Sequence, residues 1–261
     1  MTKFNQLLSI GSDAKTSKGE KIGFLTGILY LSPAALSGVQ FCPMAKIAKC
    51  EAACLNTAGR GSFNSVINGR MRKSLEFIRD RNQFMINLYA NVARLEKRAK
   101  KLALVPLVRL NGTSDIKWEN VNFTMPNGDT FANIMSAFPG VQFYDYTKIP
   151  SRHNLPVNYD ITFSYSGAPE YQKYVDRAIA AGMRIAVVFR HEAQIPESFK
   201  GLPVVSGDNS DVRHLDDQGV IVALYAKGKA KKDYSGFVVD SERATGNAWT
   251  VDESGIQYAI R

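Results

Sequence analysis

Short apolar runs separated by helical segments are the feature that most constrains the fold of this chain. Each run is β-prone and bounded by polar residues, and the runs cover residues 23–33, 103–110, 141–147, 159–166, 184–190, 202–208 and 220–228. Helical patterns stand between several of them, over 131–138 and 169–182. Strands that read as continuous apolar runs are buried on both faces, as in a parallel sheet. The sequence therefore predicts an α/β fold of seven or eight strands, a complete or partial (β/α) TIM-like barrel.

The longest periodic segment covers residues 63–101 and predicts a long amphipathic helix, or two helices with a break. Its apolar positions recur at spacings of three, four and seven. They are Leu75, Ile78, Met85, Leu88, Val92 and Leu95. A second segment, over 43–57, is rich in Ala and Lys and has no internal proline, so it predicts a further helix.

The chain has 261 residues, no internal repeat and no Pro-, Gly- or Ser-rich linker, so we expect a single domain over 1–261. No stretch of about eighteen apolar residues is present, so a membrane is not expected as a partner. The amino-terminal segment lacks a basic start followed by an apolar run and therefore resembles neither a signal nor a transit peptide. These features predict a cytoplasmic location, where thiols stay reduced.

Polar side chains follow nearly every predicted strand. In a parallel barrel the loops after the strands converge, and ligands bind there. The candidate ligand-binding residues are Arg109, Asn111, Asp115, Asp145, Lys148, Arg190, Asp208, Asp211, Arg213 and Lys227. The densest group, "SGDNSDVRHLD" over 206–216, is open to two interpretations: a capped turn in which Asp211 holds Arg213, or a site where Arg213 binds a carboxylate or phosphate. We expect a small-molecule or nucleotide ligand at these strand ends.

All three cysteines of the chain, Cys42, Cys50 and Cys54, lie within thirteen positions. An odd number of cysteines in a reducing compartment argues against a disulfide framework. Thiolates are soft ligands for zinc, Cu(I) and iron–sulfur clusters. Cys50 and Cys54 would face the same way on the predicted helix, and Cys42, which precedes Pro43, can fold back onto them. One inorganic centre can therefore meet all three thiols.

Three interpretations of the cysteines stay open. A structural zinc ion needs four ligands, so His153, His191 or His214 would have to complete its site. A [4Fe-4S] cluster held by three cysteines leaves one iron open to a ligand. The third interpretation is that the cysteines are small buried hydrophobic residues. The charged residues beside Cys50 and the tight clustering favour a metal centre.

The formal net charge of +9 raises nucleic acid as an alternative partner. The basic stretch over 72–101 contains interleaved acidic residues, so it is better explained as a solvated helix face. The lysines at the end of the last predicted strand are more suggestive, and they are Lys227, Lys229, Lys231 and Lys232. No hydrolase triad motif, P-loop or dinucleotide-binding fingerprint is present.

Several segments in combination resemble a family of bacteriophage-encoded proteins that carries a cysteine-rich, iron–sulfur-associated motif near its amino terminus. They are "CP" at 42–43, "KCEAACLNTAGRG" at 49–61, "VPLVRLNGTSD" at 105–115, "SGDNSDVRHLD" at 206–216 and "ALYAKGKAKKDYSGFVV" at 223–239. The resemblance covers about residues 25–240. It implies a phage origin, hence the cytoplasm of a bacterial host, and a cluster held by Cys42, Cys50 and Cys54.

A more distant analogy leads to enzymes that cleave S-adenosylmethionine with a three-cysteine cluster on a (β/α) barrel. Their spacing is Cys-x3-Cys-x2-Cys, whereas this chain has Cys-x7-Cys-x3-Cys. We therefore expect an iron–sulfur protein whose open iron faces a polar pocket at the strand ends, suited to radical or Lewis-acid chemistry, with S-adenosylmethionine as one possible ligand. The alternative is a basic nucleic-acid-binding protein with a structural or redox-sensing metal centre.

Overall fold

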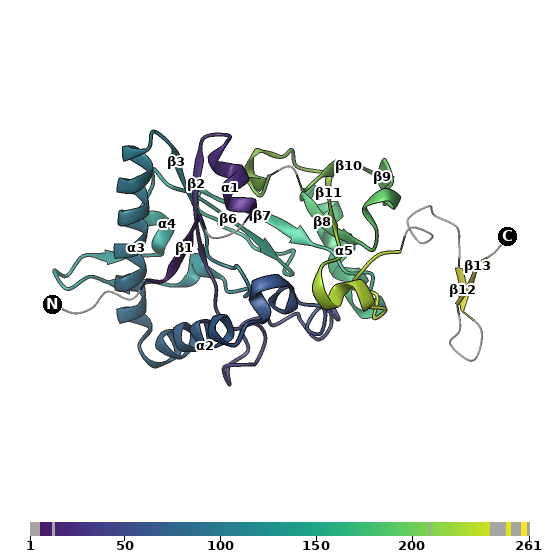
Figure 1. Cartoon of the computed structure of the whole chain (residues 1–261), viewed down its shortest axis with the longest axis horizontal. Coiled ribbons are helices and arrows are strands. Elements are labelled where there is room, and N and C mark those ends of the chain that lie inside the picture. Colours follow the sequence, from purple (N-terminus) through teal and green to yellow (C-terminus); the bar gives the residue numbers. More distant parts are fainter. Residues whose placement is uncertain (1–5, 12–13, 209, 241–248, 252–256, 260–261) are drawn as a thin grey trace.

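The computed structural model describes residues 6–11, 14–208, 210–240, 249–251 and 257–259, and a nine-stranded sheet runs through its centre (Figure 1). From one edge to the other its strands are β1 (Leu8–Ile10), β2 (Phe24–Leu29), β3 (Val105–Arg109), β6 (Gln142–Thr147), β7 (Tyr159–Ser164), β8 (Ile185–Phe189), β11 (Ile221–Tyr225), β10 (Leu202–Ser206) and β9 (Ser198–Phe199). Every pair from β2 to β10 is parallel, and only the edge strands β1 and β9 are antiparallel to their neighbours. Each apolar run singled out in the sequence forms one parallel strand.

The strand order decides between an open and a closed sheet. From β2 to β8 the strands lie side by side in sequence order, as in a barrel, but β11 then inserts between β8 and β10. In the described part of the chain no pairing joins β1 to β9, so the sheet is not closed. A mixed α/β fold with a mostly parallel sheet is therefore confirmed, and a complete TIM-like barrel is not formed.

Helices cover one face of this sheet. α3 (Arg81–Lys101) packs against β1, β2 and β3, and α5 (Gln172–Ala180) joins the apolar cluster of β7, β8 and β11. The helix α3 approaches β2 closely because Gly27 has no side chain: a Cβ there would lie 3.0 Å from Leu95 Cδ2. The remaining helices are α1 (Ala14–Glu20), α2 (Asn64–Arg79) and α4 (Ile134–Ala137). Two further hairpins are formed by β4 (Phe123–Thr124) with β5 (Thr130–Phe131) and by β12 (Trp249–Val251) with β13 (Gln257–Ala259).

The long periodic segment is two helices, and Asp80 causes the break between α2 and α3. Its backbone is extended, with φ −146° and ψ 90°, and its side chain accepts a hydrogen bond of 2.9 Å from Gln83 N, as an N-cap does. The predicted apolar face is correct in α3 but wrong in α2. Leu75 and Ile78 are exposed, and the buried face of α2 is formed by Arg70, Ser74 and Phe77. The break at Asp80 means that the helical periodicity of α3 does not continue back into α2.

The prediction of a helix over 43–57 is wrong. These residues form turns followed by the 3₁₀ segments η1 (Leu55–Thr57) and η2 (Gly59–Ser62). One helical turn begins after Cys42, but Lys49 adopts φ 53° and Cys50 N bonds back to Ala45 O. A left-handed residue with that hydrogen bond is how a helix ends. Alanine content favoured a helix here, and tertiary contacts of the loop overrode it.

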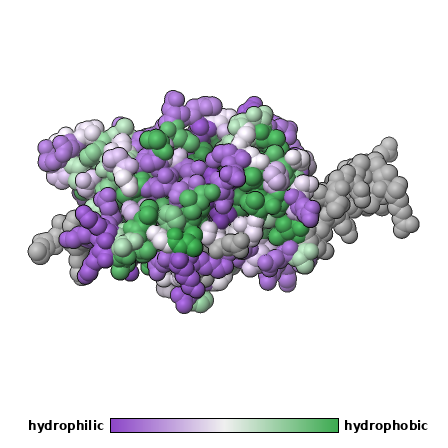
Figure 2. All heavy atoms as spheres, turned by 90° about the horizontal axis from the view of Figure 1, so that it is seen from above, coloured by the Kyte–Doolittle hydropathy of each residue, from purple (hydrophilic) through white to green (hydrophobic). Residues whose placement is uncertain are grey.

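Within the described residues, no helix combines the length and the apolar character needed to cross a bilayer. Figure 2 shows the face seen from above, where apolar residues form separate patches between hydrophilic ones. That face therefore presents no continuous apolar surface.

Candidate functional site

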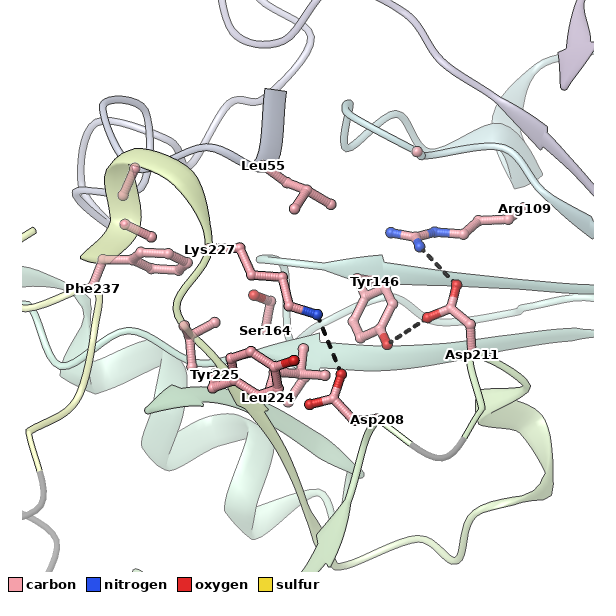
Figure 3. Close-up of a pocket in the computed structure, with 15 residues that line it drawn as sticks. Leu55, Arg109, Tyr146, Ser164, Asp208, Asp211, Leu224, Tyr225, Lys227 and Phe237 are labelled. Atoms are coloured by element: carbon pink, nitrogen blue, oxygen red, sulfur yellow. Dashed lines mark hydrogen bonds and ion pairs between the residues drawn. The ribbon is translucent and has the colours of Figure 1, made fainter. Parts of the chain in front are cut away.

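A cavity of about 240 Å³ opens at the carboxyl ends of the parallel strands (Figure 3). β3, β6, β7, β8 and β11 each contribute residues to its lining. The loop around Cys54, the segment after β10 and the 3₁₀ segment η7 (Gly228–Lys232) form its other walls. The expectation that polar residues at strand ends converge is correct, since Arg109, Asp208, Asp211 and Lys227 all line this cavity.

Strand alternation explains which side chains reach the cavity. Successive residues of a strand point to opposite faces of a sheet. In β6, Phe143 packs in the core under α3, so Tyr144 and Tyr146 point to the opposite face, which we call the pocket face. Arg109 lies two residues after Leu107, which packs with Tyr144 on that same face. The period of two therefore selects Arg109 and Tyr146 for the cavity.

Arg109 and Asp211 form the first of two ion pairs in the cavity. Arg109 Nη1 donates to Asp211 Oδ2 at 3.1 Å, and the hydroxyls of Tyr144 and Tyr146 donate to the same carboxylate at 3.4 and 3.5 Å. The guanidinium lies over the ring of Tyr146 at 4.7 Å from the ring centre. Although burial opposes the charge, Asp211 and the neighbouring tyrosines raise the pKa of Arg109 further above its ordinary value. Arg109 therefore stays a cation inside the cavity.

Lys227 and Asp208 form the second ion pair, with 3.3 Å between Nζ and Oδ1. Lys227 also lies over the ring of Tyr225, 4.4 Å from its centre. Asp208 reaches this position because Gly207 packs directly on β11, where a Cβ would lie 2.6 Å from Leu224 Cδ2. Figure 3 shows Tyr146 between the two ion pairs.

The three cysteines are partly buried and interact with one another. Burial raises the pKa of Cys42 to about 12, and the charges of Cys54 and Cys50 add to the rise. Burial also raises the pKa of Cys50 and that of Cys54. Two sulfurs accept backbone N–H hydrogen bonds, from Ala34 to Cys42 Sγ at 3.4 Å and from Asn56 to Cys54. Because Coulomb interactions fade with distance, this mutual influence means that the thiols share one region of the fold.

Lys148 is a buried lysine that belongs to the same region. Its Nζ donates to Ser164 Oγ at 2.8 Å and to the carbonyl oxygens of Ser164 and Tyr165 at 2.9 Å. The ring of Phe237 lies 4.8 Å away. Burial lowers the pKa of Lys148 to about 8. All three acceptors are neutral, so the ammonium has no ion-pair partner within 4.0 Å in the described part of the chain.

The opposite charges that act on Lys148 come mainly from the cysteines. In order of size, they are Cys50, Asp115, Cys54 and Cys42. Asp115 Oδ2 accepts a hydrogen bond of 2.8 Å from the backbone N–H of Lys148, not from the ammonium group of that lysine. The lysine therefore sits where a negative charge on the three thiols would compensate its own.

The thiol region and the cavity adjoin one another. Ala53 and Leu55, which flank Cys54, line the cavity. Ser164 and Phe237, the contacts of Lys148, line it as well. A ligand in the cavity would thus contact the residues on either side of Cys54 in the sequence, and it would contact side chains that themselves touch Lys148.

Several predicted ligand-binding residues hold the fold instead of lining the cavity. Asn111 Oδ1 accepts hydrogen bonds from Ser114, Ile116 N and Trp118 Nε1, at 2.9 to 3.0 Å. Asp145 accepts from Asn111 N at 2.7 Å on the helix-covered face of the sheet, since it alternates with Tyr146. These polar residues follow strands as expected, but their side chains satisfy loop backbone and buried donors.

Two arginines of the predicted set also have structural partners. Arg190 pairs with Asp240 and donates to the carbonyl oxygens of Lys231 and Asp233, which ties the end of β8 to the loop after η7. Arg213 is buried and pairs with Asp216 at 3.1 Å. Asp211 accepts a hydrogen bond of 3.0 Å from Arg213 N through its backbone oxygen, as in a capped turn, while its carboxylate pairs with Arg109.

Sequence reasoning did not select the aromatic and aliphatic residues of the cavity. Leu224 follows Val222 by two residues on the pocket face of β11, so strand periodicity could have indicated it, whereas Tyr225, the last residue of the strand, alternates to the other face. Leu55 and Phe237 come from irregular loops, and no local pattern in the sequence points to them.

Among the described residues, no three His, Cys, Asp or Glu side chains are arranged around a single metal ion. Neither the zinc interpretation nor the expectation of a metal centre at the three cysteines therefore finds a preformed set of ligands among these residues. His214, one of its candidates, packs against the rings of Phe24 and Tyr144 instead. A cluster differs from a single ion because each of its thiolates binds a different iron, so its sulfurs stand farther apart than the ligands of one zinc.

A model of the protein family described as "Gene product 88" matches residues 4–241. The match supports the phage family expected from the sequence segments. No curated protein and no solved structure matches the chain significantly.

Proposed function

The chain belongs to the Gene product 88 family, and we propose that it is an iron–sulfur protein whose cluster is held by Cys42, Cys50 and Cys54, beside a ligand pocket. The proposal takes the cluster to be of the [4Fe-4S] type, with one iron open toward the cavity. The proposal also includes the interpretation of the sheet as a partial barrel. In that interpretation the cysteine loop is the connection that follows the first parallel strand, β2.

The environment of the sulfurs supports a cluster. Cys42 and Cys54 accept backbone N–H hydrogen bonds, the kind of contact that tunes the potential of a cluster through its sulfurs. All three cysteines are partly buried, which limits the access of water to such a centre. Burial raises their pKa values, so the free thiols would be protonated and inert, and iron would have to displace those protons on binding.

The observation that carries the proposal is Lys148. A buried ammonium without an ion-pair partner is costly unless another charge compensates it. Three thiolates around iron and sulfide would supply that charge, because Cys50, Cys54 and Cys42, when ionised, are among the groups that raise the pKa of Lys148. Neutral thiols would leave Asp115 as the charge that compensates Lys148.

The cavity gives the proposed centre a ligand site. When bound, such a cluster supplies an iron that can hold a ligand and take part in one-electron or Lewis-acid chemistry. In this chain Leu55 and Phe237 line the cavity beside the cysteine loop, and Lys148, which lies against Phe237, provides positive charge there. S-adenosylmethionine is one candidate for the ligand, on the analogy of the three cysteines alone.

Anaerobic purification with iron and sulfide analysis tests the proposal. We expect brown protein with stoichiometric iron and sulfide, and the single variants Cys42→Ser, Cys50→Ser and Cys54→Ser should lose most of both. Ser62→Ala is a matched control, because Ser62 is exposed in the same loop and bonds only Gly59 O. Circular dichroism should show that all variants keep the secondary structure of the wild type.

Three results would contradict the proposal: wild-type protein that takes up no iron under anaerobic reconstitution, protein that binds zinc alone, or serine variants that retain the cluster. Lys148→Met adds an independent arm. If Lys148 compensates the cluster, this variant should hold iron and sulfide less tightly or shift the reduction potential downward, whereas Lys148→Arg should preserve both better.

Nucleic-acid binding is a second candidate function, and the exposed lysines of η7 favour it. Lys229, Lys231 and Lys232 are all exposed. The carboxylate of nearby Asp233 accepts hydrogen bonds from the hydroxyl of Ser235 and from Val238 N. Binding to labelled single-stranded DNA should then weaken steeply as salt rises. The triple alanine variant of these lysines should abolish it, and a triple alanine variant of Lys97, Lys100 and Lys101 on α3 is the control. Binding unaffected by the first variant would remove this candidate.

A further inference from the structure

The charged side chains of the cavity sum to zero. Arg109 and Lys227 contribute two positive charges, and Asp208 and Asp211 contribute two negative ones. The other lining residues are apolar or neutral. A ligand that brings a large net charge would therefore meet as much repulsion as attraction, and a ligand with one charge of each sign would meet complementary partners for both.

The positive side of the cavity has a donor left for an anionic group. Arg109 Nε is buried and finds no hydrogen-bond partner among the described residues, although Nη1 donates to Asp211. A buried, unpaired donor on a cation is costly, and a carboxylate can satisfy it together with a second guanidinium N–H. Lys227, whose side chain is 40% exposed, can turn toward the same group.

The two acidic residues of the cavity determine which kind of anionic ligand can bind beside the cations. Asp208 and Asp211 both come from the segment after β10 and reach into the cavity beside the two cations (Figure 3). A phosphate, with close to two negative charges, would lie against these carboxylates. An ammonium group instead gains two acceptors there. The pair of carboxylates therefore disfavours phosphorylated ligands and favours a ligand that also carries an amine.

The rest of the cavity fits a small apolar or aromatic body. Tyr146, Tyr225 and Phe237 present rings, and Leu55 and Val188 add aliphatic surface. The volume of about 240 Å³ lies just below the roughly 300–1,000 Å³ of common ligand pockets, so the ligand is small. A folded polymer cannot enter such a cavity, although a single side group can.

We propose that this cavity binds the zwitterionic end of an α-amino acid, with the carboxylate on Arg109 and Lys227 and the ammonium on Asp208 and Asp211. Its apolar or aromatic body lies among the rings toward the cysteine loop. The inference deepens the proposed function by naming its ligand class, and it rests on that function only in taking the cavity as the ligand site. Free amino acids and nucleoside conjugates of amino acids share this chemistry.

Isothermal titration of the purified full chain tests the inference, with and without anaerobic reconstitution. The probes are L-methionine, L-tryptophan and S-adenosylmethionine, which separate a free amino acid from a nucleoside conjugate. Methioninol lacks the carboxylate and N-acetylmethionine lacks the ammonium, so each should bind about tenfold or more weakly than methionine, the loss expected when one charged hydrogen-bond contact is removed. 5′-AMP is the phosphorylated comparison and should bind worse than the zwitterions.

Variants with matched controls locate the two halves of the site. Lys227→Met should weaken methionine about tenfold and leave methioninol nearly unchanged, whereas Lys229→Met, two residues along the same segment, should change neither. Asp208→Asn should weaken methionine and spare N-acetylmethionine, with the exposed Asp217→Asn as control. Circular dichroism would verify that each variant is folded.

The outcomes separate this inference from the proposed cluster. Iron and sulfide in the protein without binding of any zwitterion, or tighter binding of 5′-AMP than of every amino acid, overturns the amino-acid site and leaves the cluster standing. Amino-acid binding that follows the two pairs of variants, in protein that takes up no iron under anaerobic reconstitution, supports the site and counts against the cluster. Equal binding of methionine, methioninol and N-acetylmethionine also overturns the site.

Discussion

Asp145→Asn is the substitution for which the structure gives the most specific prediction. The carboxyl group of Asp145 is 1% exposed and accepts hydrogen bonds from Asn111 N at 2.7 Å and from the hydroxyl of Tyr159 at 2.9 Å. Asparagine has nearly the same shape, and its Oδ1 can keep the bond from Asn111 N. The substitution therefore removes one ionisation with little change in packing.

The expected magnitude follows from the pKa of Asp145. Burial raises that pKa from 3.8 to about 7, while Arg109 and the two hydrogen bonds oppose part of the rise. Between these values the folded protein holds a proton that the unfolded chain has released, so the free energy of unfolding falls as the pH rises. At about 1.36 kcal/mol for each unit, the loss above pH 7 amounts to about 4 kcal/mol. Asp145→Asn should not show this loss.

Urea denaturation followed by circular dichroism at several pH values from 5 to 8 measures the effect. The variant should gain stability relative to the wild type as the pH rises, by about 3 kcal/mol between pH 5 and pH 8, because part of the loss is already complete at pH 5. Burial raises the pKa of Asp115 as well, but Asp115 is present in both proteins and cancels in the difference. Asp176→Asn, an exposed position on α5, is the control and should give a difference that does not vary with pH.

A stability difference between Asp145→Asn and the wild type that stays constant from pH 5 to 8 would refute the reasoning. A difference that grows as the pH falls would refute it too, because it would mean that the folded state prefers the charged carboxylate. Either result would show that Arg109 and the hydrogen bonds outweigh burial at this site.

Three further substitutions test packing and buried polar contacts, each by urea denaturation of the variant. Gly207→Ala should cost about 1–3 kcal/mol through overpacking against β11, and a neutral result would show that β10 can shift away. Glu119→Gln should cost about 3–5 kcal/mol because it leaves Arg152, whose side chain is fully buried, without its carboxylate partner; a loss below about 1 kcal/mol would contradict this. Asn111→Ala should cost more than about 2 kcal/mol because it strands several donors, among them Trp118 Nε1, and a smaller loss would mean that water replaces the amide.

The sequence alone determined the strands, and the reason is local. Residues such as those of β8 (Ile185–Phe189) are apolar at every position, and a strand buried on both faces needs that pattern wherever it lies in the fold. The register of α3 was predictable for the same reason, because Met85, Leu88, Val92 and Leu95 form one stripe that any sheet would bury. The ends of the strands also indicated where charged residues would gather.

Tertiary structure decided how those elements and charges were used. The segment over 43–57 has a composition typical of helices, but Lys49 adopts a left-handed backbone conformation that ends the helical turn before Cys50. Asp211 could pair with a neighbour in sequence, yet it pairs with Arg109, which is 102 residues away. Partner choice depends on distances in space between loops from different strands, and no local pattern carries them. For that reason the sequence predicted which residue types meet at the strand ends, and only the packed sheet showed which of them share the cavity and that Lys148 lies in the same region as the three thiols.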